Sequence, residues 1–230
     1  MIVGKTSVNA TNGSDSVIVP NWASAYFSLA DTEKISKVVA AAEQATEGEI
    51  VPMVVHSSVP RWPTSALIMM TMIILGLVVN DLLELAGLGF ILALIVSMTL
   101  GFLLSKVDQL HRWIAPEAWV LEEVSEMAEL EFYRTRIHHT QKKTGILIFI
   151  SLQEQRVIVL GDEAISKKLA QNTWTELVQL ITQGMRSGQA AGGLEAAIQR
   201  CGEILAQHFP RSASDQNELS NRLLFKKGTS

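Results

Sequence analysis

Five polar residues of the sequence could together bind a metal ion or transfer protons. They are Glu49, His138, His139, Thr140 and Asp162. Carboxylate and hydroxyl oxygens are suitable ligands for Ca²⁺ or Mg²⁺, and an imidazole can serve as a general acid or base near neutral pH. Glu49, Thr140 and Asp162 are therefore candidate metal ligands. Asp162, His138 and His139 are candidate catalytic residues.

The same residues also have an ordinary structural interpretation. None of their spacings matches a metal motif such as HExxH or an EF-hand loop. Asp162 precedes a predicted helix that it could cap, and Thr140 could close the helix before it. Neighbouring helical side chains point about 100° apart, so at most one of His138 and His139 should face a site. The alternative is a capped rim with solvated histidines.

Helices and strands on both sides of a long apolar stretch must position these residues. Upstream, apolar residues at helical spacing predict a helix over residues 31–45, and residues 48–56 are typical of a strand. Pro52 lacks an N–H, which predicts that this strand lies at an edge or carries a bulge. Downstream, the pattern predicts a helix over 116–140 and a hairpin of two strands over 145–161, followed by three helices.

We therefore predict an α/β fold with a small mixed β-sheet flanked by helices. A strand leading into the apolar stretch and a helix leading back can complete a strand–helix–strand crossover. The strand directions then place all five candidate residues at one rim of the sheet, which we call the distal rim. The expected segments are a disordered arm (1–21), two domain halves (22–62 and 106–210), a hairpin between them (63–105) and a disordered tail (211–230).

Residues 63–105 are expected to form a two-helix transmembrane hairpin. The uncharged runs 63–80 and 85–105 can each span a bilayer core of about 30 Å at about 1.5 Å per residue. The connector between them is too short for anything but an antiparallel turn. Two buried helices of a soluble bundle would instead show a polar stripe at every third or fourth position, and only a few Ser and Thr residues interrupt the runs.

The charged flanks of the hairpin predict its orientation. Arg61 precedes the first span, and Lys106 and Arg112 follow the second, whereas the turn carries Asp81 and Glu84 but no Lys or Arg. The positive-inside rule places both termini and the whole α/β domain in the cytoplasm. Tryptophans flank the spans, where an amphipathic ring suits the headgroup layer; these are Trp62, Trp113 and Trp119.

Composition narrows the range of partners. The 230 residues include 23 acidic and 19 basic ones, for a net charge of −4, and contain no arginine-rich stripe, so nucleic acid is not an expected partner. The apolar share of 48% is high for a purely soluble protein. The only cysteine, Cys201, excludes an internal disulfide and lies in an apolar helical stripe, so we expect it in the core.

Several motifs make the chain resemble the TPM domain family. They are TEGEIV at 46–51, TGILIFISL at 144–152, ExRVxVLGD at 154–162, a tryptophan at 174 and HFP at 208–210. The resemblance covers nearly all of residues 27–210 except the hairpin, which is similar to an insertion in a bacterial membrane subgroup. It implies a small sheet between helices in a protein of the bacterial inner membrane. It also implies service to membrane complexes, with acid phosphatase activity assigned to a plant relative.

Three functions are consistent with these patterns. The first is a membrane-anchored accessory or interaction module that serves the assembly, repair or turnover of a membrane protein complex. The alternative is a metal-assisted phosphomonoesterase that uses the distal rim, with Arg136, Lys142 and Lys143 available to bind phosphate. The third is a homo-oligomeric pore, against which neither span offers an ionisable residue to line a water path. The expected partners are the lipid bilayer and another membrane protein.

Overall fold

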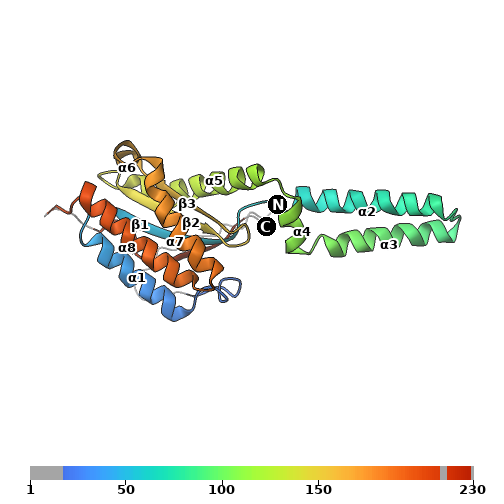
Figure 1. Cartoon of the computed structure of the whole chain (residues 1–230), viewed down its shortest axis with the longest axis horizontal. Coiled ribbons are helices and arrows are strands. Elements are labelled where there is room, and N and C mark those ends of the chain that lie inside the picture. The colour runs from blue at the N-terminus through green and yellow to red at the C-terminus, as the bar shows by residue number, and fades with distance from the viewer. Residues whose placement is uncertain (1–17, 213–216, 229–230) are drawn as a thin grey trace, which may run out of the picture.

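The computed structural model describes residues 18–212 and 217–228, and it consists of an α/β domain and a pair of long helices that projects from one end of it (Figure 1). The domain contains a four-stranded mixed sheet with the order β3-β2-β1-β4. Its strands are β1 (Glu49–Ser57), β2 (Gly145–Ser151), β3 (Arg156–Gly161) and β4 (Leu224–Gly228). The disordered arm was predicted for residues 1–21, of which residues 1–17 lie outside the described residues.

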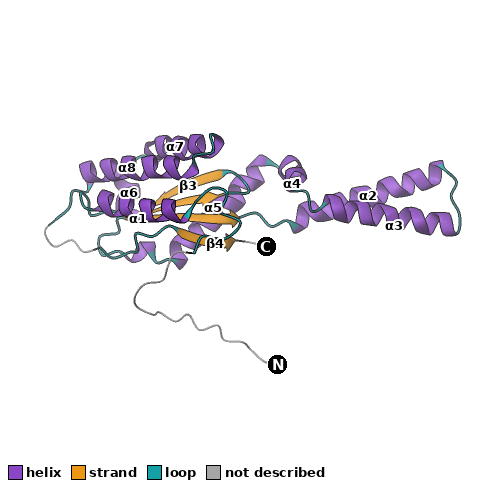
Figure 2. Cartoon of the chain, turned by 90° about the horizontal axis from the view of Figure 1, so that it is seen from below, coloured by secondary structure: helices purple, strands orange, loops and turns teal. Residues whose placement is uncertain are grey.

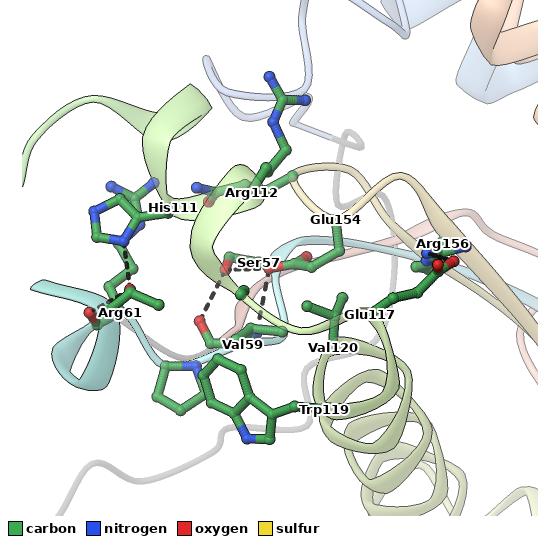
Figure 3. A pocket seen from close by; sticks show the side chains of 14 residues that line it. Ser57, Val59, Arg61, His111, Arg112, Glu117, Trp119, Val120, Glu154 and Arg156 are labelled. Atoms are coloured by element: carbon green, nitrogen blue, oxygen red, sulfur yellow. Dashed lines mark hydrogen bonds and ion pairs between the residues drawn. The ribbon is translucent and has the colours of Figure 1, made fainter. Parts of the chain in front are cut away.

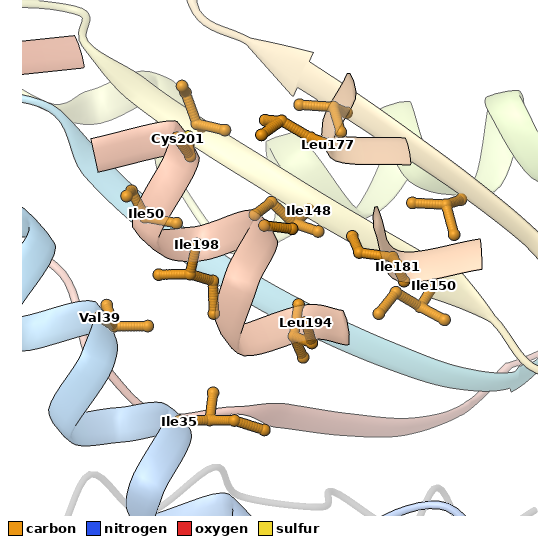
Figure 4. Close-up of a cluster of buried hydrophobic side chains, with 14 of the residues drawn as sticks. Ile35, Val39, Ile50, Ile148, Ile150, Leu177, Ile181, Leu194, Ile198 and Cys201 are labelled. Carbon is orange, nitrogen blue, oxygen red and sulfur yellow. The ribbon is translucent and has the colours of Figure 1, made fainter. Parts of the chain in front are cut away.

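Helices cover both faces of the sheet, as predicted for this fold class (Figure 2). Side chains of a strand alternate between the two faces of the sheet. Because helices cover both faces, both alternating sets of side chains in β2 are apolar and buried. Ile148 faces the larger core, which is completed by α1 (Leu29–Glu43), α7 (Thr175–Arg186) and α8 (Ala190–His208) (Figure 4). Phe149 faces a smaller core closed by α5 (Glu117–Arg134).

The predicted crossover is confirmed by the strand pairing. β1 and β2 run parallel in a register that extends from Glu49 opposite Gly145 to Val55 opposite Ser151, and β3 is antiparallel to β2. The connection from β1 to β2 passes through the projecting helices and returns along α5 (Figure 1). Residues on both sides of the apolar stretch therefore share one sheet.

Cys201 lies in the larger core on α8, as its sequence pattern predicted. Its side chain is fully buried, and this burial raises the pKa of the thiol to about 12. Since the thiolate is the reactive form, the native thiol should react very slowly near neutral pH.

The prediction that β1 is an edge strand or carries a bulge is wrong, because β1 pairs with β2 on one side and β4 on the other. The backbone N–H of Ile50 points away from β2 and donates to Glu43. By alternation, the nitrogen of Pro52 points the same way. The β4 pairing begins only at Met53 opposite Leu224, so no ladder bond is required of Pro52.

The C-terminal tail also differs from its prediction. Residues 224–228 are not a disordered tail but form β4, which runs parallel to β1. Phe225 packs edge-on against Trp22 and Phe27, with ring centroids 6.0 and 6.1 Å apart. The strand is therefore held by a free edge of β1 and by aromatic packing, neither of which is visible in its own short sequence.

The projecting helices are α2 (Trp62–Leu82) and α3 (Leu88–Leu104), which pack antiparallel (Figure 2). α2 is long and apolar enough to cross a membrane, and α3 is a shorter apolar helix. The short helix α4 (Asp108–Ile114) connects α3 to α5. α6 (Glu163–Lys168) and two 3-10 turns, η1 (Ile137–His139) and η2 (Gln171–Trp174), complete the described elements.

Candidate functional site

The distal rim exists as a place in the fold, at the end of the sheet opposite the projecting helices. Glu49 and Gly145 are register partners at the starts of β1 and β2. The backbone N–H of Asp162, just after β3, donates to the carbonyl oxygen of Gly145 at 2.9 Å. Thr140 lies four residues before Thr144 and accepts a hydrogen bond from its N–H at 3.1 Å. The strand directions therefore predicted the neighbourhood of these residues correctly.

Most carboxylate oxygens of the rim nevertheless accept hydrogen bonds from the protein's own backbone, and the exception among the described residues is the buried Oδ2 of Asp162, which has no partner. The Glu49 carboxylate accepts hydrogen bonds from the N–H groups of Glu218 and Leu219, at 2.9 and 3.3 Å. Asp162 is the N-cap of α6, and its Oδ1 accepts from the N–H of Glu163 at 2.6 Å. The described residues include no group of three or more His, Cys, Asp or Glu that could hold a metal ion.

The two histidines do not extend from the end of α5, as the sequence suggested. α5 ends at Arg134, and Arg136 adopts a left-handed conformation with φ 58°, which starts the separate turn η1. The rings of His138 and His139 lie 4.2 Å apart between centroids, and His138 also contacts Tyr133 edge-on at 5.0 Å. His138 therefore belongs to an aromatic cluster.

The lysines expected to bind phosphate at the rim already pair with acidic side chains. Lys142 forms an ion pair with Glu47, and Lys143 forms one with Glu163. The ammonium groups of Lys143 and then Lys167 lower the pKa of Glu163 to about 2. These exposed pairs contribute little to stability, but a phosphate would have to compete with them.

Asp162→Ala is expected to lower the free energy of unfolding by about 0.5–2 kcal/mol, since it removes a helix cap. Asp162→Asn should have a smaller effect because Asn is an equally good N-cap. Urea denaturation of the wild type and both variants in detergent measures these effects. Each protein is measured with and without Mg²⁺ or Ca²⁺ at about 5 mM, well above the dissociation constants of usual sites. A stabilisation by the cation that is lost in Asp162→Asn would show that the rim is a metal site after all.

A second site, which the sequence did not reveal, lies where the domain meets the projecting helices (Figure 3). It is a cavity of about 300 Å³ that we call the junction pocket. The end of β1, the first turn of α2, α4, the start of α5 and the β2–β3 turn all contribute to its lining. Its charged and polar residues include Arg61, Arg112, Gln153, Glu154 and Arg156.

Glu154 connects the β2–β3 turn to the end of β1 at the junction pocket. Its carboxylate accepts hydrogen bonds from the Ser57 hydroxyl at 2.8 Å and from the N–H groups of Ser58 and Val59 at 3.2 and 3.3 Å. The hydroxyl of Ser151 donates to it as well. Arg156, two residues further along the chain, donates to Glu117 at 2.6 Å.

A buried histidine, His111, is hydrogen-bonded to the domain ends of both projecting helices beside this pocket. His111 Nε2 lies 2.8 Å from the carbonyl oxygen of Ser105 at the end of α3. A carbonyl can only accept, so Nε2 carries a hydrogen. Nδ1 of the same ring is hydrogen-bonded to the hydroxyl of Thr64 in the first turn of α2. The side chains of His111 and Thr64 are both buried, and these hydrogen bonds connect α4 to the domain ends of α2 and α3.

Comparison with known proteins identifies the domain. Residues 119–204 match the sequence model of the TPM domain. The chain carries a TPM domain. Its fold is similar to that of the BA42 protein from the psychrophilic bacterium Bizionia argentinensis, solved by NMR, with a TM-score of 0.57 and 16% identity over 87% of this chain and 96% of that one. At that identity the likeness concerns the fold alone. No curated protein matches the chain.

The TPM match begins within α5, yet the TPM fold in this chain needs residues from upstream. β1 lies between β2 and β4, and α1 packs on α8 in the larger core. α2 and α3 fall outside the matched residues. The junction pocket is formed where these helices join the TPM domain, so sequence patterns of the domain alone could not have indicated it.

Proposed function

We propose that this chain is a membrane-anchored accessory protein, in which α2 and α3 cross the bilayer and the TPM domain binds another membrane protein. The observation that carries the proposal is the exposure of apolar side chains along the projecting helices. Only 11% of the residues in the most apolar 18-residue stretch of α2 are buried. On α3, Leu92 and Val96 are 53% and 63% exposed. A core helix of a soluble bundle would bury such residues.

The dimensions of the pair suit this role. With 21 residues, α2 is about 31 Å long, and the 17 residues of α3 reach about 26 Å, close to the thickness of a bilayer core. Polar side chains within the pair bond to their own helices: the hydroxyls of Thr71, Ser97 and Thr99 donate to carbonyl oxygens four residues earlier. No donor of these residues is therefore left to face lipid.

Small residues allow α2 and α3 to approach closely. A Cβ at Gly76 would lie 2.0 Å from the Ser97 hydroxyl oxygen, and one at Gly101 would lie 3.2 Å from Cβ of Met72. Close packing through small residues is a common basis of helix association in lipid. The two helices thus form a hairpin with internal contacts rather than two independent tails.

The flanking charges support an orientation with the TPM domain and both termini in the cytoplasm, for a chain of a bacterial inner membrane. Arg61 and Lys106 lie at the domain end of the hairpin, whereas the turn between α2 and α3 has no Lys or Arg. Trp62 and Trp113 are 74% and 85% exposed at the same end, where they would lie in the headgroup layer.

An accessory role fits the rim better than a phosphatase does, because the Glu49 carboxylate and Oδ1 of Asp162 accept hydrogen bonds from backbone N–H groups. The full chain expressed in bacteria should stay in the membrane fraction after extraction at alkaline pH. The purified chain should hydrolyse a generic phosphomonoester no faster with Mg²⁺ or Ca²⁺ than an Asp162→Asn variant does. Release by alkali would disprove membrane anchoring, and metal-stimulated turnover lost in the variant would establish the phosphatase.

A further inference from the structure

We propose that the junction pocket binds the headgroup of an anionic phosphoglycerol lipid, with Arg156 binding the phosphate and Gln153 binding a headgroup hydroxyl. The inference rests on the proposed membrane crossing of α2 and α3. If these helices cross the bilayer, the pocket at their foot lies at the headgroup layer, with exposed Trp62 and Trp113 beside it.

The size of the pocket suits a headgroup. Its volume of about 300 Å³ is at the lower end of the range for small-molecule sites. Such a volume accommodates a phosphodiester with a three-carbon polyol but not an acyl chain as well. The acyl chains of a bound lipid would instead follow the apolar exterior of α2 and α3.

Two polar atoms among the pocket residues lack hydrogen-bond partners within the described structure, one a donor and the other an acceptor. Nε of Arg156 is a buried donor without an acceptor, and Oε1 of Gln153 is a buried acceptor without a donor. Buried polar groups are nearly always satisfied, so each marks a missing partner. A phosphate oxygen would satisfy the arginine, and a hydroxyl hydrogen would satisfy the amide. A phosphoglycerol headgroup supplies both.

The charges that line the pocket favour an anion. Among the described side chains they are three guanidinium groups, of Arg61, Arg112 and Arg156, and two carboxylates, of Glu117 and Glu154. The Glu154 carboxylate already accepts hydrogen bonds from four donors, and the Glu117 side chain is 79% exposed at the margin. Guanidinium groups bind phosphate oxygens with paired, charge-assisted hydrogen bonds.

Native mass spectrometry of the full chain, released from nanodiscs that contain equal phosphatidylglycerol and phosphatidylcholine, tests the inference. The wild type should retain phosphatidylglycerol with a preference of about tenfold or more, as expected for one or two charge-assisted bonds. Arg156→Gln should reduce that preference to near unity. The matched control is Lys106→Gln, which also removes one positive charge, just after the domain end of α3, from a residue outside the pocket lining. This variant should keep the preference.

Three results would overturn the inference. The first is equal retention of both lipids by the wild type. The second is an equal loss of the lipid preference in Lys106→Gln and Arg156→Gln, which would indicate diffuse surface charge. The third is binding of soluble glycerol phosphate as tight as that of the lipid. Should Arg156→Gln fail to fold, Ala115→Phe provides a second test, because it narrows the pocket without changing charge and should also abolish the preference. A chain that does not enter nanodiscs would contradict the proposed function itself, whereas one that enters without lipid preference contradicts only the headgroup site.

Discussion

Ile148→Asp is expected to unfold both sides of the split TPM domain in a single transition. Ile148 is fully buried in β2, between Pro52 of β1 and Val159 of β3. No described cation lies in the apolar core around it, so the new carboxylate would be buried without a partner at a cost of several kcal/mol. A domain of this size has a stability of about 5–15 kcal/mol, so much of it would be lost.

Limited proteolysis and hydrogen exchange in detergent should then show loss of protection in α1 as well as in α7 and α8. The matched control is Ile18→Asp, the same substitution at a residue that is 80% exposed, which should leave protection unchanged. If α1 and β1 stayed protected in Ile148→Asp, the residues before the hairpin would be an independent unit, in conflict with the shared sheet.

Replacing residues 61–115 by a short Gly/Ser linker should give a folded TPM domain that stays soluble without detergent. Val59 and Val120 line the same pocket, so the cut ends lie close enough for a few residues to join them. The pairing of β1 with β2 and β4 involves no residue of the removed segment. The replacement also removes the exposed apolar side chains of α2 and α3.

Size-exclusion chromatography without detergent, together with thermal unfolding, measures this result. A chain in which the same linker replaces only residues 83–87, the turn between α2 and α3, keeps both apolar helices and should remain dependent on detergent. An excised chain that aggregates or shows no cooperative unfolding would mean that the projecting helices contribute to the folding of the domain.

The sheet was predictable because its signals are local. In β2, isoleucines at 146, 148 and 150 alternate with Leu147 and Phe149, and both sets are apolar, as a strand between two helical layers requires. β4 gave no such signal: its five residues include two lysines, and its pairing depends on a free edge of β1 that begins at Met53.

The candidate sites were predictable only in part. Strand directions placed Glu49 and Asp162 at one rim, but the N–H groups that occupy Glu49 come from Glu218 and Leu219, in a segment with no periodic pattern. The junction pocket draws on three stretches that lie far apart in the sequence, residues 57–64, 111–120 and 153–156. Its arginines 61 and 112 were visible in the sequence as topology signals, and their place in the lining of one pocket with Arg156 depends on the three-dimensional fold.

Cysteine accessibility in intact bacteria tests the central claim, which is that α2 and α3 cross the membrane and leave the TPM domain in the cytoplasm. The native Cys201 gives little background, because it is buried and its pKa is raised to about 12. One variant carries Asp81→Cys in the exposed last turn of α2, next to the connection to α3, and the other carries Gln199→Cys on the exposed face of α8. A membrane-impermeant maleimide should label Asp81→Cys in intact cells and Gln199→Cys only after both membranes are permeabilised. Labelling of Gln199→Cys from outside, or protection of Asp81→Cys until permeabilisation, would contradict the account.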